Sequence, residues 1–138
     1  NGFIFVSNYT YAVGETDLPA DAAAGQRNIP YFKQVENTWN LSLGYDDGPW
    51  DIRLAATYRD NYLDEVGSKP LNDRYTDDHM QLDLTAKYKV NDSLRLTFEA
   101  INLNDEPEYY YFGNPSRLSQ YDEYGATYGV GFRYILNQ

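Results

Sequence analysis

Four consecutive aromatic residues, Tyr109-Tyr110-Tyr111-Phe112, are the strongest candidate for binding chemistry in this chain. A carboxylate precedes them at Glu108, and a guanidinium follows at Arg117. Aromatic faces beside such groups can stack on a sugar ring or an aromatic chelate while the polar groups fix its orientation. The candidate substrate-binding residues are Tyr109, Tyr110, Tyr111 and Arg117. The alternative is that these rings belong to an interfacial aromatic belt or pack within a loop.

Catalytic chemistry has little support in the residue types present. The chain has no cysteine, which excludes thiolate nucleophiles, thiolate metal sites and disulfides. Its single histidine, His79, follows Asp78 at the end of an expected strand. A Ser-His-Asp triad would need a serine and a carboxylate close to this ring. We expect an ordinary histidine at the rim of a sheet, no catalytic residue and no enzyme.

Carboxylates gather between the expected strands and raise the question of a calcium site. The residues concerned are Asp60, Asp64, Glu65, Asp73, Asp77, Asp78, Asp105, Glu106 and Glu108. Carboxylate-rich loops can hold calcium. No segment has the Asp-x-Asp-x-Asp-Gly spacing of a calcium loop. We therefore expect solvated acidic loops, no metal site and no cofactor.

A second group of charged residues occupies alternate positions within the expected strands. They are Arg53, Arg59, Asp83, Lys87, Arg95, Glu99 and Arg133. Successive side chains of a strand point to opposite faces, so this spacing predicts one charged face. Such a face could line a path for an anionic substrate. The plainer account is that these residues form ion pairs with Asp51, Asp83, Glu99 and Glu123 on the same face, because charges removed from bulk water are normally paired.

The elements that position these residues are strands. Alternation of apolar and polar residues predicts six of them, at residues 2–13, 35–46, 50–62, 78–90, 94–103 and 121–136. The face of the first strand is ambiguous. Phe3, Phe5, Tyr9 and Tyr11 compete with Ile4, Val6 and Ala12 for its apolar side.

The last segment has the longest stripe. Its alternate positions carry Tyr124, Ala126, Tyr128, Val130, Phe132, Tyr134 and Leu136. A typical soluble strand has about five or six residues, whereas a strand that crosses a bilayer has about 9–11. This length favours a transmembrane strand.

Connections between the expected strands alternate in length. Residues 46–49 and 91–93 are tight turns, while residues 14–34, 63–77 and 104–120 are long connections. In outer-membrane barrels the periplasmic turns are short and the extracellular loops are long. The rhythm therefore predicts a periplasmic C-terminus and three extracellular loops.

The composition agrees with a membrane barrel and argues against nucleic acid as a partner. The mean hydropathy is -0.69, and no run of about 18 apolar residues exists, so no transmembrane helix is expected. Fifteen tyrosines and two tryptophans suit membrane interfaces, where the apolar ring and polar tip are both satisfied. A net charge of -10 repels phosphate backbones, so we expect no nucleic-acid partner.

Six strands cannot close a membrane barrel, because single-chain bacterial barrels begin at about eight strands. An open sheet in lipid leaves two edges of unpaired backbone groups, each costing several kcal/mol. We therefore expect the chain to form part of a larger barrel with a wet, polar lumen.

Several segments resemble TonB-dependent outer-membrane receptors. Glu99-Ala100-Ile101-Asn102-Leu103-Asn104-Asp105-Glu106-Pro107 resembles their penultimate-strand motif. Gly113, Ser116 to Tyr128 and Gly131-Phe132-Arg133-Tyr134 resemble the closing strand, and Asn8-Tyr9-Thr10-Tyr11 is similar to an earlier one. The resemblance covers the chain in order and is strongest after Leu94.

This resemblance implies an all-β, antiparallel transmembrane barrel of about 22 strands around an N-terminal plug. Residues 1–138 would supply the last six strands, the C-terminal part of the barrel domain. Implied partners are the rest of the barrel, its plug, the TonB complex acting through that plug, and outer-membrane lipid. The implied substrate is a scarce nutrient: an iron chelate, a vitamin or an oligosaccharide. The family usually ends on an aromatic residue, whereas Asn137-Gln138 follow Leu136 here.

Two other functions remain open from the residues alone. A soluble, acidic β-sandwich that binds carbohydrate through aromatic loops would also show alternation. A porin-like barrel without TonB coupling would show the same loop rhythm.

Overall fold

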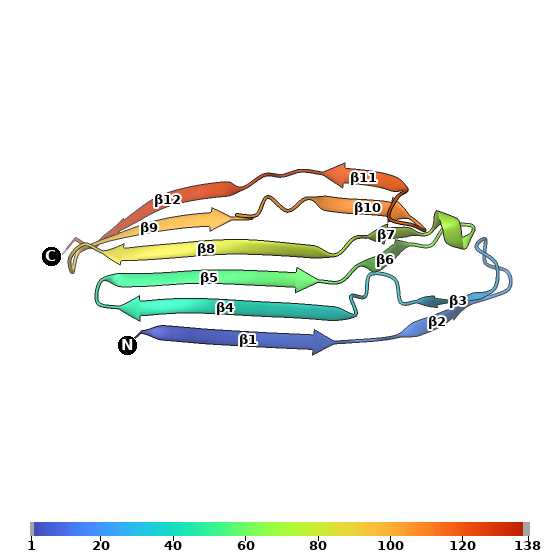
Figure 1. Ribbon diagram of the computed structural model, residues 1–138, viewed down its shortest axis with the longest axis horizontal. Helices are drawn as coiled ribbons and strands as arrows, with labels where there is room; N and C mark the ends of the chain where they lie inside the picture. Colours follow the sequence, from blue (N-terminus) through green and yellow to red (C-terminus); the bar gives the residue numbers. More distant parts are fainter. Residues whose placement is uncertain (1, 137–138) are drawn as a thin grey trace.

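The computed structural model describes residues 2–136 as an all-β protein with three antiparallel sheets (Figure 1). The tail formed by Asn137 and Gln138 lies outside the described residues. No helix within residues 2–136 has both the length and the apolar character needed to cross a membrane. The prediction of an all-β, antiparallel fold is confirmed.

The largest sheet contains the six predicted strands, in the order β1-β4-β5-β8-β9-β12. Their bounds are β1 Phe3–Tyr11, β4 Asn37–Asp47, β5 Trp50–Arg59, β8 His79–Lys89, β9 Leu94–Ile101 and β12 Thr127–Tyr134. Tight turns join β4 to β5 and β8 to β9 at one end of this sheet, and β1 begins and β12 ends there (Figure 1). Within the described residues β1 and β12 are free edges, so this sheet does not close on itself.

Pairing with β4 decides the face of the first strand. Phe5 lies opposite Leu43, and Tyr9 lies opposite Trp39. Residues directly opposite in an antiparallel pair share a face. The aromatic residues of β1 therefore join the apolar face, and Ile4 and Val6 lie on the other one.

Two rows of aromatic residues bound this apolar face. Tyr9 and Trp39 have ring centroids 4.3 Å apart in one row, and Trp50 and Tyr88 have centroids 4.5 Å apart in the other. Tyr58 pairs with Trp39, and the eight residue steps from Trp50 to Tyr58 span about 27 Å along the strand. A strand tilt of about 40° reduces this to roughly 20 Å, close to the apolar band of an outer-membrane barrel.

The long connections contain strands that the sequence did not predict. They are β2 Glu15–Leu18, β3 Arg27–Pro30, β6 Tyr62–Glu65, β7 Arg74–Thr76, β10 Glu108–Phe112 and β11 Leu118–Asp122, with the short 3-10 helix η1 Pro70–Asn72. A four-stranded sheet, β11-β10-β7-β6, continues beyond the end of the large sheet, and β2 pairs with β3 beside it (Figure 1). The prediction of six strands is therefore incomplete, because each of the three long connections resumes strand pairing after a short break.

The closing strand is also interrupted. We expected one strand over residues 121–136, but β11 ends at Asp122 and β12 begins at Thr127. Gly125 lies between them with a φ of 74°, a left-handed conformation that glycine adopts without steric cost. The expected strand over residues 50–62 is also interrupted, since β5 ends at Arg59 and only Tyr62 of β6 lies within the expected range.

A side-chain amide replaces backbone pairing where β9 ends. The Asn104 Oδ1 accepts a 2.9 Å hydrogen bond from the Leu82 amide, and its Nδ2 donates to the Met80 carbonyl. Asn102, at a φ of 57°, uses its side chain to bond both the amide and the carbonyl of Glu106, at 2.8 and 3.0 Å. The motif at residues 99–107 therefore has a structural role: it turns the chain while keeping the backbone groups of β8 satisfied.

We expect Asn104→Ala to lower the free energy of unfolding by about 1–3 kcal/mol, because two backbone groups of β8 lose their partner. The measurement is the midpoint of urea unfolding of the intact protein. Asn28→Ala is the matched control, since its amide bonds only the exposed Asp17 carboxylate. Equal midpoints for the two variants would contradict the pairing role.

Candidate functional site

Most buried side chains lie in the connections rather than in the large sheet. Ile29, Leu63, Asp73, Thr76 and Tyr111 are each at most 4% exposed. They come from β3, β6, η1–β7 and β10, so all three long connections contribute buried side chains. The connections therefore pack together, and this packing fixes the positions of the side chains that could bind a ligand.

A buried ion pair joins the first connection to the second. The Arg27 guanidinium donates two hydrogen bonds of 2.6 Å to the two Asp73 carboxylate oxygens, and one of 3.1 Å to the Gly67 carbonyl. The Gly67 amide donates to the same carboxylate at 2.8 Å. This bidentate pair raises the pKa of the Arg27 guanidinium. It fixes the β2–β3 hairpin against the turn between β6 and β7.

A second ion pair ties the two middle strands together. The Arg74 Nε donates a 2.8 Å hydrogen bond to the Asp64 carboxylate, and its Nη2 lies 3.5 Å from the Glu65 carboxylate. The hydrogen bond to Asp64 raises the pKa of Arg74. The same guanidinium lies over the Tyr110 ring, 5.1 Å from its centroid. Arg74 thus links β6, β7 and β10.

The three predicted substrate-binding tyrosines form strand β10, so they alternate between its faces. Tyr111 is buried, stacks on Tyr75 at 5.5 Å, and accepts a 2.9 Å hydrogen bond from Asn61 Nδ2. Burial raises the pKa of the Tyr111 phenol. Tyr109 donates to the Pro115 carbonyl at 2.8 Å, and Tyr110 lies under Arg74. The rings therefore do not form a single flat platform.

The fourth predicted binding residue, Arg117, lies in the hairpin between β10 and β11. Its guanidinium donates a hydrogen bond to the Leu71 carbonyl of η1. Gly113, in the same hairpin, donates its amide to the Asp73 carbonyl at 2.9 Å. Arg117 is exposed, and it contributes to the contact between the second and third connections.

The pairing register brings the seven predicted lumen residues onto one face of the large sheet, opposite the aromatic rows. Arg53 lies opposite Thr85, and Thr85 lies opposite Glu99. Lys87 lies opposite Asp51, while Arg95 lies between Lys89 and Arg133. Asp83 and Arg59 occupy the corresponding positions farther along their strands.

Ion pairing on this face agrees only in part with the expected partners. Asp51 lies 3.4 Å from Arg53 and 3.7 Å from Lys87. Asp83 instead accepts hydrogen bonds from the Gln81 amide and the Asn102 backbone. Within residues 2–136 neither Arg95 nor Arg133 has a carboxylate within salt-bridge distance.

Arg59 joins the charged face to the four-stranded sheet. It donates a 2.7 Å hydrogen bond to Glu108 and a 2.9 Å bond to the Asp77 carbonyl, and it lies over the Tyr62 ring at 5.4 Å. Glu108 is not among the four expected partners, and it also lies 3.8 Å from the His79 Nδ1. Sequence reasoning missed this contact because Glu108 is 49 residues away from Arg59. In residues 2–136 no group of three or more histidines and carboxylates is placed to hold a metal ion.

Asp77, in the link between β7 and β8, gives a pH-dependent test of this junction. Burial raises the pKa of its carboxyl group above the ordinary value. The unfolded chain therefore ionises first as pH rises, and stability falls between the ordinary and the raised pKa. We expect Asp77→Asn to raise the urea midpoint at pH 7 and to change it little at pH 3.

Asp92 is the control, because its pKa is shifted in the opposite direction to that of Asp77. A hydrogen bond from Lys89 lowers the pKa of its carboxyl group, so the ionised form is favoured in the folded protein. This contribution is present above the ordinary pKa and is lost as pH falls through the lowered one. Asp92→Asn should lower the midpoint at pH 7; the same direction for both variants would contradict the assignment.

A known protein family matches most of the chain. The family model described as TonB dependent receptor-like, beta-barrel, matches residues 2–103. These residues include β1 to β9 and end before β10. The match overlaps the segment of strongest sequence resemblance at residues 94–103. Comparisons with curated proteins and with solved structures found no match.

Proposed function

The chain belongs to the TonB-dependent receptor β-barrel family, and we propose that its large sheet is a piece of the wall of an outer-membrane nutrient transporter. One observation carries this proposal: an exposed apolar face of membrane height between two aromatic rows. On this face Val130 is 86% exposed and Phe132 is 76% exposed. Exposed apolar area of this extent is stable when lipid or a partner covers it.

The opposite face supports a lumen. It is lined by charged and small residues, including Arg53, Lys87, Glu99 and Gly129, in place of a packed core. Polar residues facing inward and apolar residues facing lipid are the arrangement of a water-filled outer-membrane barrel. We therefore assign the seven charged residues of this face to the lumen.

The free edges of β1 and β12 support a larger assembly. Unpaired backbone groups cannot face lipid, so each edge needs a partner strand. We propose that residues 1–138 are the C-terminal six strands of a barrel of about 22, completed by earlier strands of the same protein. A plug and the TonB complex would complete the transporter, as in its family.

The two ends of the sheet support an orientation. The tight turns lie at one end, and the packed connections lie at the other (Figure 1). We place the turns and the C-terminus in the periplasm and the connections outside the cell, following the rule for bacterial barrels. The nutrient, an iron chelate, vitamin or oligosaccharide, would first meet the connections, with Tyr109, Tyr110 and Arg117 among its contacts.

The alternative of a soluble β-sandwich has less support. A sandwich buries the apolar face of one sheet under a second sheet. In residues 2–136 the four-stranded sheet extends the large one lengthwise and leaves its apolar face uncovered (Figure 1). The porin-like alternative is disfavoured by the family to which residues 2–103 belong.

Cysteine labelling tests the proposal, because the native chain has no cysteine. Ser68→Cys places a thiol in the second connection, and Asp92→Cys places one in a tight turn. In intact cells a membrane-impermeant maleimide should label Ser68→Cys alone, and permeabilising the outer membrane should expose Asp92→Cys. The reverse labelling pattern would overturn the proposed orientation. Fractionation that recovers the protein outside the outer membrane would overturn its proposed role as a transporter.

A further inference from the structure

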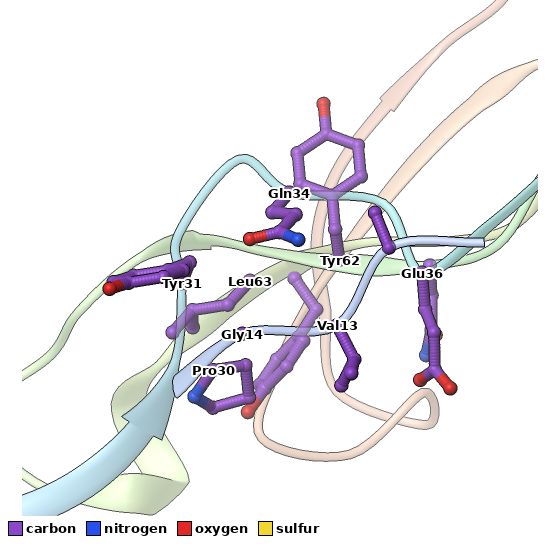
Figure 2. Close-up of a pocket in the computed structure, with 11 residues that line it drawn as sticks. Val13, Gly14, Pro30, Tyr31, Gln34, Glu36, Tyr62 and Leu63 are labelled. Carbon is purple, nitrogen blue, oxygen red and sulfur yellow. The ribbon is translucent and has the colours of Figure 1, made fainter. Parts of the chain in front are cut away.

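A hollow of about 150 Å³ lies where the first connection crosses the end of the large sheet (Figure 2). Its wall includes Tyr31, Gln34 and Glu36 from the segment after β3, and Tyr62, Leu63 and Tyr75 from β6 and β7. We call it the Gln34 pocket. It is separate from the predicted binding residues, since none of Tyr109, Tyr110, Tyr111 and Arg117 lines it.

Backbone contacts hold the walls of the Gln34 pocket in place. The Lys33 amide donates a 2.6 Å hydrogen bond to the Leu63 carbonyl, which attaches the segment after β3 to the free edge of β6. The Tyr31 amide donates to the Gly14 carbonyl at 3.0 Å, and the Ala12 amide donates to the Glu36 carbonyl at 2.9 Å. The pocket is therefore built from paired segments rather than from a free loop.

Gly14 sets the position of one aromatic wall. A Cβ at this residue would lie 2.4 Å from Cδ2 and 2.7 Å from Cε2 of the Tyr31 ring. Such contacts are far shorter than van der Waals distances, so any larger residue displaces the ring. Glycine thereby lets Tyr31 lie directly against the backbone at the edge of the pocket.

The polar side chains of the pocket are available to a ligand. Among the described residues neither the Gln34 amide nor the Glu36 carboxylate has a side-chain hydrogen bond or ion pair. Figure 2 shows the Gln34 amide near Tyr31 and Leu63, with the Glu36 side chain on the other side of the view and its carboxylate directed away from Gln34. An amide offers two donors and an acceptor, and a carboxylate offers acceptors.

The residue types of the lining indicate the chemistry of the ligand. The wall contains no lysine, arginine or histidine, so an anion would meet Glu36 without a compensating cation. Tyr31, Tyr62 and Tyr75 supply aromatic surface, with Arg59 over one face of Tyr62 and Tyr111 stacked on one face of Tyr75. Gln34 and Glu36 supply partners for hydroxyl groups. A single water needs about 10–15 Å³ of such space, so a hollow of about 150 Å³ has room for one ring of a ligand.

We propose that the Gln34 pocket binds one neutral pyranose ring of an oligosaccharide, with a hydroxyl-rich edge toward Gln34 and Glu36. This inference rests on the proposed function, because it names the substrate class that the extracellular side of the transporter would accept. It makes the hairpin formed by β2 and β3, with the segment that follows, a specificity element.

The test is isothermal titration of the intact, detergent-solubilised protein with maltotriose, xylotriose and triacetylchitotriose in separate experiments, and with ferric citrate as an anionic probe. At least one trisaccharide should bind. Gln34→Ala and Glu36→Gln should each weaken that binding about tenfold, since each removes a hydrogen bond to a hydroxyl group. Gly14→Ala should weaken it as well, through the displaced Tyr31 ring.

The matched controls are Gln26→Ala and Glu123→Gln, which change the same residue types at exposed positions outside the pocket. Both should bind the trisaccharide like the native protein. Retained heat-modifiable migration of every variant on a gel shows that the barrel is folded.

Several outcomes would overturn the proposal. They are an absence of trisaccharide binding, equal binding by the pocket and control variants, and ferric citrate binding that depends on Gln34. These results concern the pocket alone, since the labelling of Ser68→Cys and Asp92→Cys reports separately on the transporter. If the protein is found outside the outer membrane but still binds the sugar through Gln34, the pocket proposal stands and the proposed transporter function is overturned.

Discussion

Replacing Leu84 by arginine is expected to destabilise the protein in a bilayer by about 2–4 kcal/mol. Leu84 lies on β8 opposite Leu54, midway between the aromatic rows of Trp50 and Tyr58. At this depth the charged side chain would be transferred from water into the hydrocarbon core of the bilayer, and the strand offers it no polar partner on that face. The measurement is the free energy of unfolding in lipid vesicles, or, in cells, the amount of folded barrel in the outer membrane.

Thr85→Arg is the control because it makes the same change one residue away on the opposite face. Thr85 lies opposite both Arg53 and Glu99, so the new guanidinium would meet a carboxylate in a wet lumen. We expect at most about 1 kcal/mol of destabilisation here. Equal losses at the two positions would contradict the assignment of lipid and lumen faces, whatever the nutrient.

Replacing Asp73 by alanine is expected to cost about 3–5 kcal/mol, the second large effect. The Arg27 side chain is 16% exposed, and removal of its partner leaves a mostly buried guanidinium with one carbonyl, that of Gly67. The Gly67 amide also loses its acceptor. The β2–β3 hairpin should then detach, which faster hydrogen exchange of residues 15–30 would reveal.

Two comparisons distinguish this buried pair from an ordinary one. Asp51→Ala removes the partner of Arg53, whose side chain is 58% exposed, and should cost at most about 1 kcal/mol. The double variant Arg27→Met with Asp73→Leu should recover much of the loss, because it leaves no unpaired charge. Native-like exchange in Asp73→Ala would show that the hairpin is held by its apolar contacts, such as those of Ile29.

Strands with one apolar and one polar face were predictable from local sequence. In residues 50–58 every second residue is Trp50, Ile52, Leu54, Ala56 or Tyr58, and a period of two permits one face assignment. β1 lacked this clarity because both of its faces carry apolar residues. Only the register that places Tyr9 opposite Trp39 resolved it.

The strands in the connections have a local signal in the sequence, yet the sequence analysis did not predict them. Tyr109, Tyr110 and Tyr111 have high strand propensity, and the sequence identified them as chemically important. Their arrangement depends on β7, where Tyr75 pairs with Tyr111, and no local pattern indicates that partner. Burial of Tyr111 is therefore a property of the assembled sheet.

The sequence by itself determined the six-stranded sheet, its striped face and the family, because alternation and turn residues act between near neighbours. Only the tertiary structure decided how the connections combine. Arg27 and Asp73 are 46 residues apart, and Tyr31 reaches Gly14 across a hairpin. Ion pairs, cores and pockets of this kind depend on distances in space, which chain separation does not encode until the strands have paired.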